Sequence, residues 1–310
     1  MYTPFVSVII PTYNRDEELI ELIYSLLESD YKNIEVIVVD DASPSGIPEE
    51  IKSIRTVKVI RNKKEKLLAG SRNVGIENAR GELCFLVDSD NVVARNTISE
   101  LVKAIHSNPL LGVVCPLTYY LEDPLRIWWA GTIRSKITSL TRSIGQDQLD
   151  LNQFKTLIES ESFRNAFMVR TKLIQNLGLF DEKYFPIHYD EADLSERIKR
   201  EGVKIVVVPT AKIWHNIPRK TKYRSLHIPS KLRAYYGIRS RVLFHKKWSS
   251  NLLELIVALS SISLITVYYA VMALFYAPQP QKYDIFKSTL QGFIDGLRTH
   301  IASLLQDKID

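Results

Sequence analysis

The sequence predicts an α/β protein built on an open, mixed sheet flanked by helices. Short runs rich in valine and isoleucine recur along the first half of the chain, and they are apolar on both faces, as buried strands are. Amphipathic stretches with helical spacing lie between them. Polar residues follow directly after three of the runs, where ligands bind in open α/β sheets. The expected strands are residues 6–10, 34–40, 57–61, 83–88 and 112–117.

The remaining elements follow from the same periodicities. Residues 15–29 carry leucine and isoleucine at helical spacing, and Asn14 with Glu17 is predicted to form a capping box at their start. Residues 119–155 lose clear periodicity, so we expect a loop-rich insertion there. A second α/β stretch follows, with strands at 163–170 and 204–209 and helices at 172–177 and 194–201.

Residues 255–277 form an apolar segment of 23 residues without a charge. As a helix this segment would be about 34 Å long, enough for a bilayer core. Lys and Arg are more frequent before it than after it, so a spanning helix would leave the preceding domain in the cytosol. A re-entrant or interfacial hairpin, or an ordinary core helix, fits the same pattern. We therefore predict a C-terminal helical segment that associates with the membrane.

Charge and cysteine content narrow the class of protein. The 310 residues include 41 Lys and Arg against 35 Asp and Glu, yet residues 211–250 hold 11 basic residues and no acid. Such a block suits an anionic membrane surface or a phosphorylated ligand, whereas nucleic acid is disfavoured because no recognised binding motif accompanies it. Cys84 and Cys115 lack the spacing of a zinc site or a disulfide framework, which favours a reduced, cytosolic compartment. No cleavable signal peptide is expected.

Asp88 and Asp90 lie at the exit of the expected strand 83–88, with one serine between them. Two carboxylates held close together offer oxygen ligands to Mg²⁺ or Mn²⁺, which commonly keep positions open for phosphate oxygens. The same Asp-X-Asp pattern also occurs in solvated turns, where the acids cap a helix. The motifs elsewhere in the chain favour the metal site.

Four motifs occur together and in order along the chain. They are VSVIIPTYNR (6–15), VIVVDDAS (36–43), GSRNVGIENARGELCFLVDSDN (70–91) and LGLFDEKYFPIHYDEADLSERIKREG (177–202). The ordered set resembles the inverting, family 2 glycosyltransferases of GT-A fold, over about residues 5–245. Within that family it looks like a membrane-associated single-sugar transferase of the rhamnosyltransferase-like kind. The resemblance implies a nucleotide-binding sheet, a nucleotide-sugar donor and a divalent metal.

The resemblance also implies a set of donor-binding residues. Tyr13 offers a flat face for a nucleobase, and Asp41 can accept a base N–H. Arg72 and Asn73 would meet the diphosphate, the arginine through a charge-assisted contact, and Asp88 would contact the ribose or the waters of the metal. The implied nucleotide-sugar-binding residues are Pro11, Tyr13, Asn14, Asp41, Arg72, Asn73 and Asp88.

The implied metal ligands are Asp90, Asp88 and His215. By resemblance Asp90 is the ligand on which the family relies most, and His215 stands where many relatives supply a further one. The cation, Mn²⁺ or Mg²⁺, would neutralise charge on the leaving nucleoside diphosphate. A single histidine beside a tryptophan is also often structural.

Inversion at the sugar needs a base that takes the proton from the acceptor hydroxyl. The run DEAD at 190–193 precedes the expected helix, where acids are favoured by the helix dipole and also serve as caps. Relatives commonly have Glu-Asp-x-Asp here and use its second residue, so the resemblance implies Glu191 as the base. Asp193 would bind the acceptor or support the base, and the change from Asp to Glu leaves Asp190 as an alternative base.

The sequence thus predicts a GT-A catalytic domain at 1–250 and a helical membrane-associating region at 251–310. The predicted function is transfer of one sugar from a nucleoside diphosphate sugar to a glycan or lipid-linked acceptor, at the cytoplasmic face of the cell membrane. Two alternatives are a polyprenyl-phosphate sugar synthase and a non-catalytic, membrane-tethered sugar-nucleotide binder. These motifs do not specify sugar, acceptor or oligomeric state, because variable loops such as 119–155 set specificity.

Overall fold

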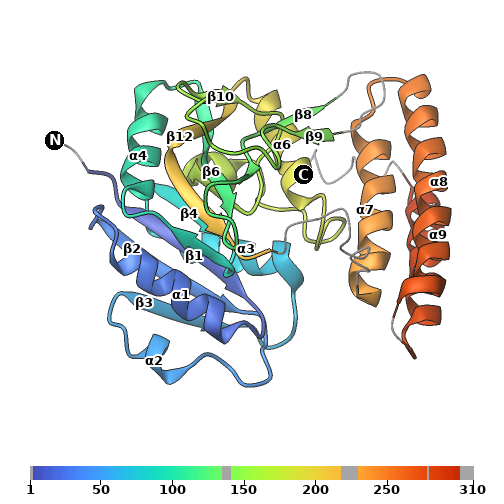
Figure 1. Ribbon diagram of the computed structural model, residues 1–310, viewed down its shortest axis with the longest axis horizontal. Coiled ribbons are helices and arrows are strands. Elements are labelled where there is room, and N and C mark those ends of the chain that lie inside the picture. Colours follow the sequence, from blue (N-terminus) through green and yellow to red (C-terminus); the bar gives the residue numbers. More distant parts are fainter. Residues whose placement is uncertain (1–2, 135–140, 218–229, 278, 301–310) are drawn as a thin grey trace. The chain divides into compact units, whose positions relative to one another are not determined.

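The computed structural model describes residues 3–134, 141–217, 230–277 and 279–300. These residues form two compact units (Figure 1). The first, called the sheet unit below, has the described residues 3–134, 141–180 and 194–217. The second, the helical unit, has the described residues 181–193, 230–277 and 279–300.

The sheet unit is built on one mixed sheet (Figure 1). Within the described residues its path runs β10-β12-β6-β11-β4-β1-β2-β3, with β5 paired to β12 and β7 paired to β6. Parallel pairing joins β4, β1, β2 and β3, and β11 runs antiparallel between β4 and β6. The predicted open, mixed sheet is confirmed. Its strands are β1 (Val6–Thr12), β2 (Ile34–Asp40), β3 (Val57–Arg61), β4 (Leu83–Val87), β5 (Asn91–Val93), β6 (Leu111–Tyr120), β7 (Ile127–Trp129), β10 (Ile158–Glu159), β11 (Ala166–Arg170) and β12 (Lys204–His215).

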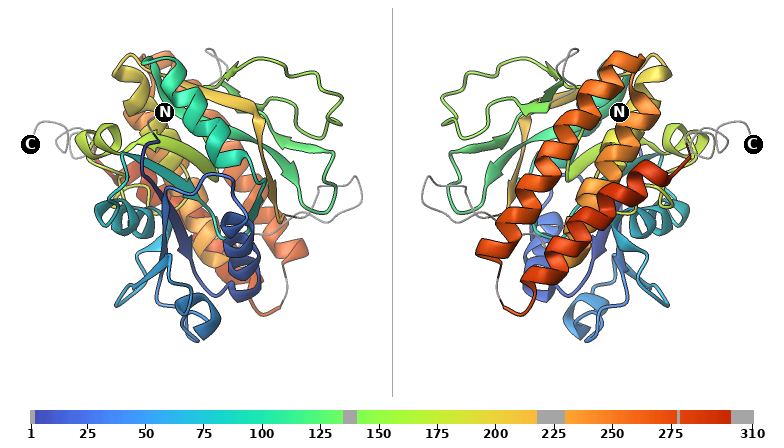
Figure 2. Two further views of the ribbon diagram at one scale, coloured as in Figure 1. Left: turned by 90° about the vertical axis from the view of Figure 1, so that its left-hand side faces the viewer. Right: turned by 90° about the vertical axis from the view of Figure 1, so that its right-hand side faces the viewer.

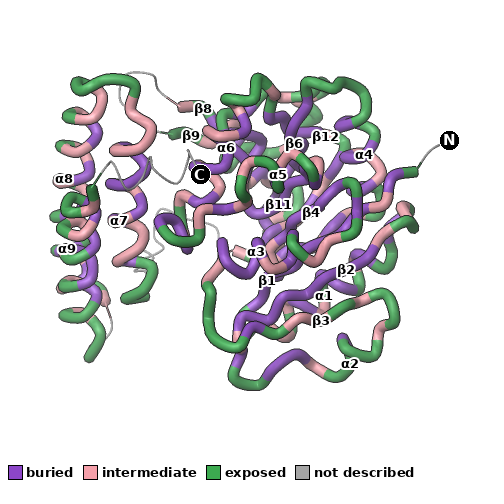
Figure 3. The backbone as a smooth tube through the Cα atoms, turned by 180° about the vertical axis from the view of Figure 1, so that it is seen from behind, coloured by how far each residue is buried: buried purple, intermediate pink, exposed green. Residues whose placement is uncertain are grey.

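Helices cover both faces of this sheet, and the inner strands are buried (Figure 3). Val8 and Ile10 of β1 pack in the layer of α1 and α4, whereas Ile9 packs in the layer of α3. Each fully buried aliphatic side chain stabilises the fold by about 1.5–3 kcal/mol. This is why runs that are apolar on both faces specify inner strands. The helices are α1 (Asp16–Leu27), α2 (Glu49–Lys52), α3 (Leu67–Glu77), α4 (Thr97–Ser107), α5 (Thr171–Asn176) and α6 (Asp190–Arg200).

Several predicted elements end or begin elsewhere in the structure, two of them by four residues or more. The last strand, expected to stop at Pro209, continues as β12 to His215. An irregularity between Val208 and Lys212 accommodates the proline, which cannot donate a ladder hydrogen bond. The helix expected at 194–201 begins four residues earlier, at Asp190, because acids in the first turn are favoured by the helix dipole.

The predicted capping box at Asn14 is wrong. Asn14 has a left-handed backbone, with φ of 52°, and its N–H donates to Ser43 Oγ at 2.9 Å. Within the described chain Arg15 takes the N-cap position of α1 without a side-chain capping bond. Asn14 instead forms the turn that connects the loops after β1 and β2, a conformation that asparagine tolerates better than most residues.

The described parts of the segment 119–155, residues 119–134 and 141–155, contain more strand than the sequence suggests. β6 extends to Tyr120, β7 pairs with it, and β8 (Thr132–Arg134) pairs with β9 (Thr141–Ser143) as an antiparallel ribbon. Trp129 is fully buried, and its indole N–H donates to Thr132 Oγ1 at 3.0 Å. Short strands of three residues give little periodicity, which is why the sequence did not show them.

The helical unit contains α7 (Lys231–Trp248), α8 (Leu252–Tyr276) and α9 (Lys282–Arg298). The three helices pack on one another (Figure 2). One contact joins Ala234, Ala273 and Ile285, one from each helix. Because α7 packs with α8 and α9, the compact units do not divide at residue 250; the extent of the catalytic domain, expected to be 1–250, stays a prediction.

Among the described residues, α8 is the one helix whose length and composition would allow it to cross a membrane. It therefore matches the apolar segment expected at 255–277, and it begins three residues earlier. Length and apolar composition alone are weak support for a membrane role, because core helices of soluble proteins share them.

Candidate donor and catalytic site

The loops after β1, β2 and β4 carry the predicted donor-binding residues. These strands are neighbours in the order β4-β1-β2, and all three are parallel, so their carboxyl ends lie along one edge of the sheet. Pro11, the last residue but one of β1, is buried and lies opposite Val39 in the ladder. Tyr13, directly after β1, is 45% exposed. The arrangement confirms that these loops converge at a strand-end edge, where open α/β sheets bind ligands.

Asp41 anchors the loop that enters α3. Its Oδ1 accepts from Asn62 Nδ2 and from the N–H of Lys66, both at 2.8 Å, and its Oδ2 accepts from the N–H of Leu67 at 2.9 Å. The side chain is nearly fully buried. Asp41 therefore caps the start of α3, the structural role that the sequence offered as an alternative to its predicted contact with a base.

Arg72 and Asp88 form an ion pair beside this edge. Arg72 of α3 is only 1% exposed, and its Nη2 donates to Asp88 Oδ1 at 2.8 Å. Its guanidinium also lies over the ring of Phe180, 5.4 Å from the centroid. The pair holds the Asp88 carboxylate in a fixed orientation and keeps a positive charge next to the Asp-Ser-Asp turn.

Asn73 is engaged with the backbone. Its Nδ2 donates to the carbonyl oxygen of Phe180 at 2.9 Å, and its Oδ1 accepts from the N–H of Phe180 at 2.9 Å. The side-chain amide therefore ties α3 to the chain at Phe180. The diphosphate contact expected of Asn73 stays a prediction.

Asp90 and His215 are brought together by the pairing of β5 with β12. In this ladder Asn91 lies opposite His215, and the N–H of Asn216 donates to the carbonyl oxygen of Asp90 at 2.8 Å. His215 Nε2 lies 3.3 Å from Asp90 Oδ1, and Arg15 Nη1 lies 2.6 Å from Asp90 Oδ2. Burial would raise the pKa of Asp90, but His215 and Arg15 outweigh it and hold that pKa below its usual range.

The predicted metal ligands fit a divalent cation only in part. Among the described residues, no three or more His, Cys, Asp or Glu side chains gather closely enough to hold an ion. The predicted trio of Asp90, Asp88 and His215 is therefore not assembled, because the Asp88 carboxylate turns to Arg72. Asp90 and His215 alone still offer one oxygen and one nitrogen ligand, which fits a cation whose other positions are taken by diphosphate oxygens and water.

Three residues outside the predicted set of binding, metal and catalytic residues lie at this site. Arg15 pairs with Asp90, as described above, and two asparagines hold the Asp-Ser-Asp turn. Asn165 Nδ2 donates to Asn91 Oδ1 at 2.8 Å, and Asn91 Nδ2 donates to the carbonyl oxygen of Asp88 at 2.9 Å. The N–H of Asp88 in turn donates to the carbonyl oxygen of Asn165 at 2.9 Å. A polar residue just before the apolar run of β11 was the available signal.

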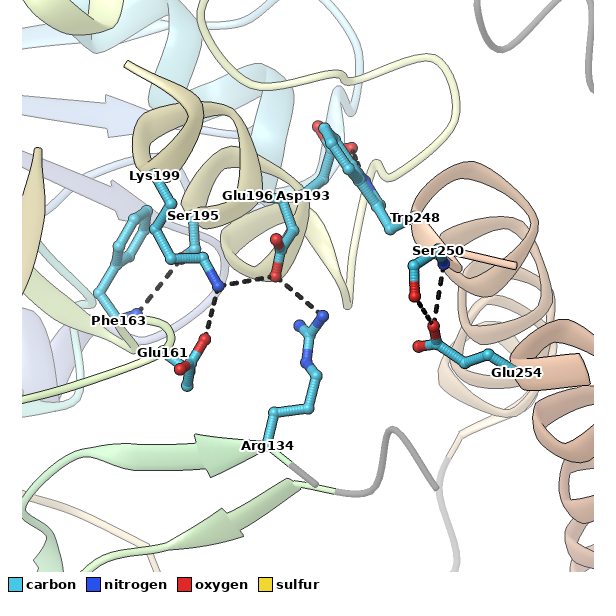
Figure 4. A network of polar contacts seen from close by, with 10 residues as sticks. All are labelled: Arg134, Glu161, Phe163, Asp193, Ser195, Glu196, Lys199, Trp248, Ser250 and Glu254. Atoms are coloured by element: carbon cyan, nitrogen blue, oxygen red, sulfur yellow. Dashed lines mark hydrogen bonds and ion pairs between the residues drawn. The ribbon is translucent and has the colours of Figure 1, made fainter. Parts of the chain in front are cut away.

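The acidic helix start at 190–193 belongs to the helical unit. Asp190 and Asp193 are buried, whereas Glu191 is half-buried. Asp193 Oδ1 accepts from the indole N–H of Trp248 at 2.8 Å and lies 2.8 Å from Lys247 Nζ (Figure 4 shows the tryptophan contact). Of the three acids, Glu191 is therefore the one whose side chain reaches solvent.

The backbone before this helix start is strained. His188 and Tyr189 both have left-handed backbones, with φ of 64° and 63°, a conformation that costs of order 1–3 kcal/mol per residue outside glycine. The Tyr189 hydroxyl accepts from Arg241 Nε at 2.6 Å, and its ring packs on Phe244. Burial, and then Arg233 and Arg241, lower the pKa of His188 to about 4. Such strain clusters at functional sites, where it fixes the direction of a side chain.

The later turns of α6 belong to the sheet unit and are held by charged contacts. Glu196 pairs with Arg134 at 2.8 Å and with Lys199 at 3.0 Å, and Lys199 also reaches Glu161 at 2.7 Å (Figure 4). The Ser195 hydroxyl accepts from the N–H of Phe163. These contacts attach α6 to β8 and to the segment before β11.

The fold and its strand-end site define an open α/β protein of the nucleotide-binding class. The profile described as "Glycosyl transferase family 2" matches residues 7–177, which is more than half of the chain. The protein belongs to the glycosyl transferase family 2.

Sequence relatives match part of the chain. An uncharacterized glycosyltransferase of Haemophilus influenzae is 33% identical over 109 residues, which are 35% of this chain and 37% of that protein. Glycosyltransferase GlyG of Streptococcus pneumoniae is 34% identical over 104 residues, 32% of this chain and 35% of that protein. The match thus spans little more than a third of the length of either relative.

Solved structures with little sequence identity share the fold. GalNAc-T7, crystallised with UDP, GalNAc and Mn²⁺, superposes with a TM-score of 0.62 at 17% identity, covering 98% of this chain and 58% of that chain. The mannosyltransferase PcManGT of Pyrobaculum calidifontis, in complex with GDP-Man and Mn²⁺, gives 0.57 at 19% identity, covering 96% of this chain and 88% of that chain. Both structures confirm a GT-A-like fold for this protein.

Proposed function

We propose that the protein is a metal-dependent, inverting glycosyltransferase. It moves one sugar from a nucleoside diphosphate sugar to a glycan or lipid-linked acceptor at the cytoplasmic face of the cell membrane. The observation that carries this proposal is the contact between Asp90 and His215 beside the Arg72–Asp88 pair, at the carboxyl edge of a nucleotide-binding sheet. Family membership and the nucleotide sugars bound by the structural neighbours support it.

The donor is bound by the loops after β1, β2 and β4. Tyr13 is exposed enough for its ring to stack on a nucleobase, while Asp41 fixes the loop below it and can receive a base N–H through a remaining lone pair. The buried positive charge of Arg72 favours the diphosphate, because charge-assisted hydrogen bonds are the strong ones. Pro11, Asn14 and Asn73 shape these loops.

Asp90 and His215 would hold the metal, and Asp88 would contact the ribose or the metal's waters. A ligand pair that includes an imidazole suits Mn²⁺ better than Mg²⁺, which favours all-oxygen coordination. When bound, the cation supplies neutralisation of the charge that develops on the leaving diphosphate. Arg15 must release Asp90 Oδ2 before this oxygen can become a ligand.

Glu191 acts as the base. Its carboxylate takes the proton of the acceptor hydroxyl while that oxygen attacks the anomeric carbon from the face opposite the diphosphate, which inverts the configuration. Glu191 suits this task better than Asp190 because Asp190 is buried. Asp193 is buried against Lys247 and Trp248, so it supports the helix start and does not contact the acceptor.

The test is release of nucleoside diphosphate from a panel of sugar nucleotides with Mn²⁺ or Mg²⁺, with membrane extract as acceptor. We expect release from one donor, dependent on metal and lost in Asp90→Ala. Asp30→Ala, an exposed acid elsewhere in the sheet unit, serves as the matched control and should keep the wild-type rate. Equal release by wild type and Asp90→Ala would contradict the metal assignment.

A polyprenyl-phosphate sugar synthase is the second candidate function, favoured by the apolar helix α8. The synthase differs from the first candidate function only in its acceptor, which is polyprenyl phosphate. Replacing the membrane extract by polyprenyl phosphate distinguishes the two candidates, because only the synthase transfers sugar when this lipid is the sole acceptor. If the protein is of the rhamnosyltransferase-like kind, its donor is a deoxyhexose nucleotide. The same panel of sugar nucleotides tests this, because only that donor should then release nucleoside diphosphate. A protein that binds sugar nucleotides without catalysis would show calorimetric binding and no release with any acceptor.

A further inference from the structure

We infer that α8 attaches the protein to an anionic bilayer by lying in the plane of the membrane surface, without crossing it. This inference deepens the membrane location proposed above and rests on it. It concerns the helical unit alone.

One face of α8 exposes a long apolar stripe. Leu264, Val267, Val271 and Phe275 recur at three- and four-residue spacing, which places them on one side of the helix, and Leu253 continues that side toward the N-terminus. Leu264 and Phe275 are 74% and 77% exposed. No charged residue interrupts the helix from Leu255 onward. Large contiguous apolar surfaces of this kind mark interaction sites.

The opposite face of α8 is committed to its neighbours. Its buried residues lie at a second helical spacing and are mostly small: Ala258, Ile262, Thr266, Ala270 and Ala273. Ile262 packs with Ile238 and Val242 of α7, and Ala273 packs with Ala234 of α7 and Ile285 of α9. α8 is therefore one member of a three-helix packing, with only its outer side available to a lipid phase (Figures 2 and 3).

The helices packed on α8 are polar on their other sides. α9 carries Lys282, Asp284, Lys287, Asp295 and Arg298 along its length. Asp295 accepts from the hydroxyl of Tyr235 at 2.9 Å. A charged residue at the centre of a spanning helix costs about 2.5–3.5 kcal/mol or more. If α8 crossed the bilayer in this packing, the charges of α9 would enter the hydrocarbon with it.

α7 adds a second obstacle to a spanning arrangement. Arg239 donates to the carbonyl oxygen of Tyr184, and Lys247 pairs with Asp181 and Asp193. These contacts tie α7 to the segment 181–193, most of which is not helical. Irregular backbone does not occur in lipid-exposed positions within the hydrocarbon region. A helix lying at the interface keeps all these groups on the water side.

The charge and the side chains of the helical unit indicate that a bilayer covers the exposed face of α8. The described residues 230–300 hold nine Lys and Arg against three Asp and Glu, which suits an anionic leaflet. Tyr268 and Tyr276, in the C-terminal half of α8, and Tyr283, in the first turn of α9, are exposed. Tyrosine is favoured at the depth of the lipid headgroups. The hydroxyls of Ser261 and Ser263 donate to carbonyl oxygens one turn earlier, so they do not need water.

The first experiment is flotation of the full chain with vesicles of phosphatidylcholine, with or without one third phosphatidylglycerol, in the absence of sugar nucleotide. We expect binding that is tighter with phosphatidylglycerol and at least tenfold weaker for Leu264→Asp/Phe275→Asp. Leu125→Asp/Leu151→Asp, two equally exposed leucines of the sheet unit, is the matched control and should bind as wild type does. Equal binding by all three proteins would overturn the inference.

The second experiment measures depth. Single cysteines at Leu253, Leu264 and Phe275 are labelled with a fluorophore and quenched by lipids with a nitroxide at acyl carbon 5 or 12; the native Cys84 and Cys115 are buried and do not label. An in-plane helix predicts that all three are quenched more by carbon 5, to within twofold of one another. Stronger quenching of position 264 by carbon 12, with both ends shallow, would show a spanning helix and overturn the inference.

A second copy of the chain is the competing occupant. In that case the protein would not float with vesicles, none of the three labels would be quenched, and Leu264→Asp/Phe275→Asp would convert a dimer to a monomer in sedimentation. That result would overturn the inference. Because vesicle binding is measured without donor or acceptor, it succeeds or fails independently of the sugar-transfer assay.

Discussion

The two units of this protein bury their apolar residues in different ways. In the sheet unit, runs such as β1 and β4 are covered on both faces, and the predicted site residues of the loops gather where the strands end. In the helical unit, α8 is as apolar as those strands but only one of its faces is covered. The difference teaches that apolar composition alone does not say what covers a surface. The outer face of α8 in the helical unit therefore stays exposed, and we infer above that a bilayer covers it.

The largest effect is expected for Glu191, the proposed base, which lies in the helical unit. Glu191→Gln should lower the transfer rate by about 10²–10⁴-fold, because a positioned base contributes that much. Binding of the sugar nucleotide, which we propose to depend on the sheet unit, should be unchanged in calorimetry. Asp190→Asn is the matched comparison. If Glu191→Gln transferred at the wild-type rate and Asp190→Asn did not, the base would be Asp190.

The second prediction tests the buried ion pair that supports the helix start. Lys247→Met leaves Asp193, which is fully buried, without its cation, and should destabilise the protein by about 3–5 kcal/mol. Urea unfolding followed by tryptophan fluorescence measures this, since Trp248 contacts the same carboxylate. Lys247→Met/Asp193→Leu should restore most of the stability, because replacing both charges removes the unpaired one. A change below about 1 kcal/mol in the single variant would show that the pair is not structural.

The third prediction concerns pH and the strained turn of the helical unit. His188 faces Arg233 and Arg241 of α7 and titrates near 4, below its ordinary value of 6.5. The unfolded chain therefore binds more protons between these values, so this contribution is fully present above pH 6.5 and is lost as pH falls toward 4.

Urea titrations at pH 4 to 7 check this dependence. His188→Asn is the variant of choice, because asparagine tolerates the left-handed backbone at this position. It should flatten the pH dependence of the unfolding free energy between 4 and 6.5. An unchanged slope in His188→Asn would assign the acid sensitivity to other groups.

The smallest effect tests how closely the three helices pack. A Cβ on Gly292 of α9 would lie 2.3 Å from the carbonyl oxygen of Tyr235 in α7, and backbone cannot move aside easily. Gly292→Ala should therefore destabilise the protein by about 1–3 kcal/mol. Gly237→Ala, whose nearest neighbour would be His188 at 3.8 Å, is the control and should be neutral or slightly stabilising. Thermal unfolding of both variants distinguishes the outcomes.

The strands and the donor loops could be predicted because their signals are local. β2 and β3 occur at their expected residues. β2 is an apolar run that is buried along almost its whole length, and β3 is a partly exposed strand at the end of the sheet that keeps valine and isoleucine at three of its five positions. Asp41 and Asp90 were predicted as site residues because they come within three residues of the end of β2 and β4; their roles stay predictions. The capping role of Asn14 was predicted wrongly, because its turn is set by a hydrogen bond to Ser43, 29 residues later in the chain.

The residues that surround the site could not be predicted in the same way. Asn165 reaches Asn91 only through the antiparallel insertion of β11 beside β4, and Arg15 reaches Asp90 across 75 residues of sequence. The orientation of Asp88 toward Arg72, which removes it from the predicted metal trio, likewise depends on the packing of α3. Hydrogen bonds between residues far apart in the sequence do not change the local pattern of apolar and polar residues, so that pattern cannot predict them.

The sequence by itself determined the α/β class, the family resemblance, the inner strands and the apolar character of α8, because each is encoded in the pattern of neighbouring residues. Tertiary structure decided which polar groups meet. It joined Asp90 to His215 through the ladder of β5 and β12, and it buried Asp190 and Asp193 while leaving Glu191 at the surface. It also covered one face of α8 and left the other open. The physical reason is that composition sets the free energy of burial, whereas the three-dimensional fold selects which side chains are buried and which partners they have.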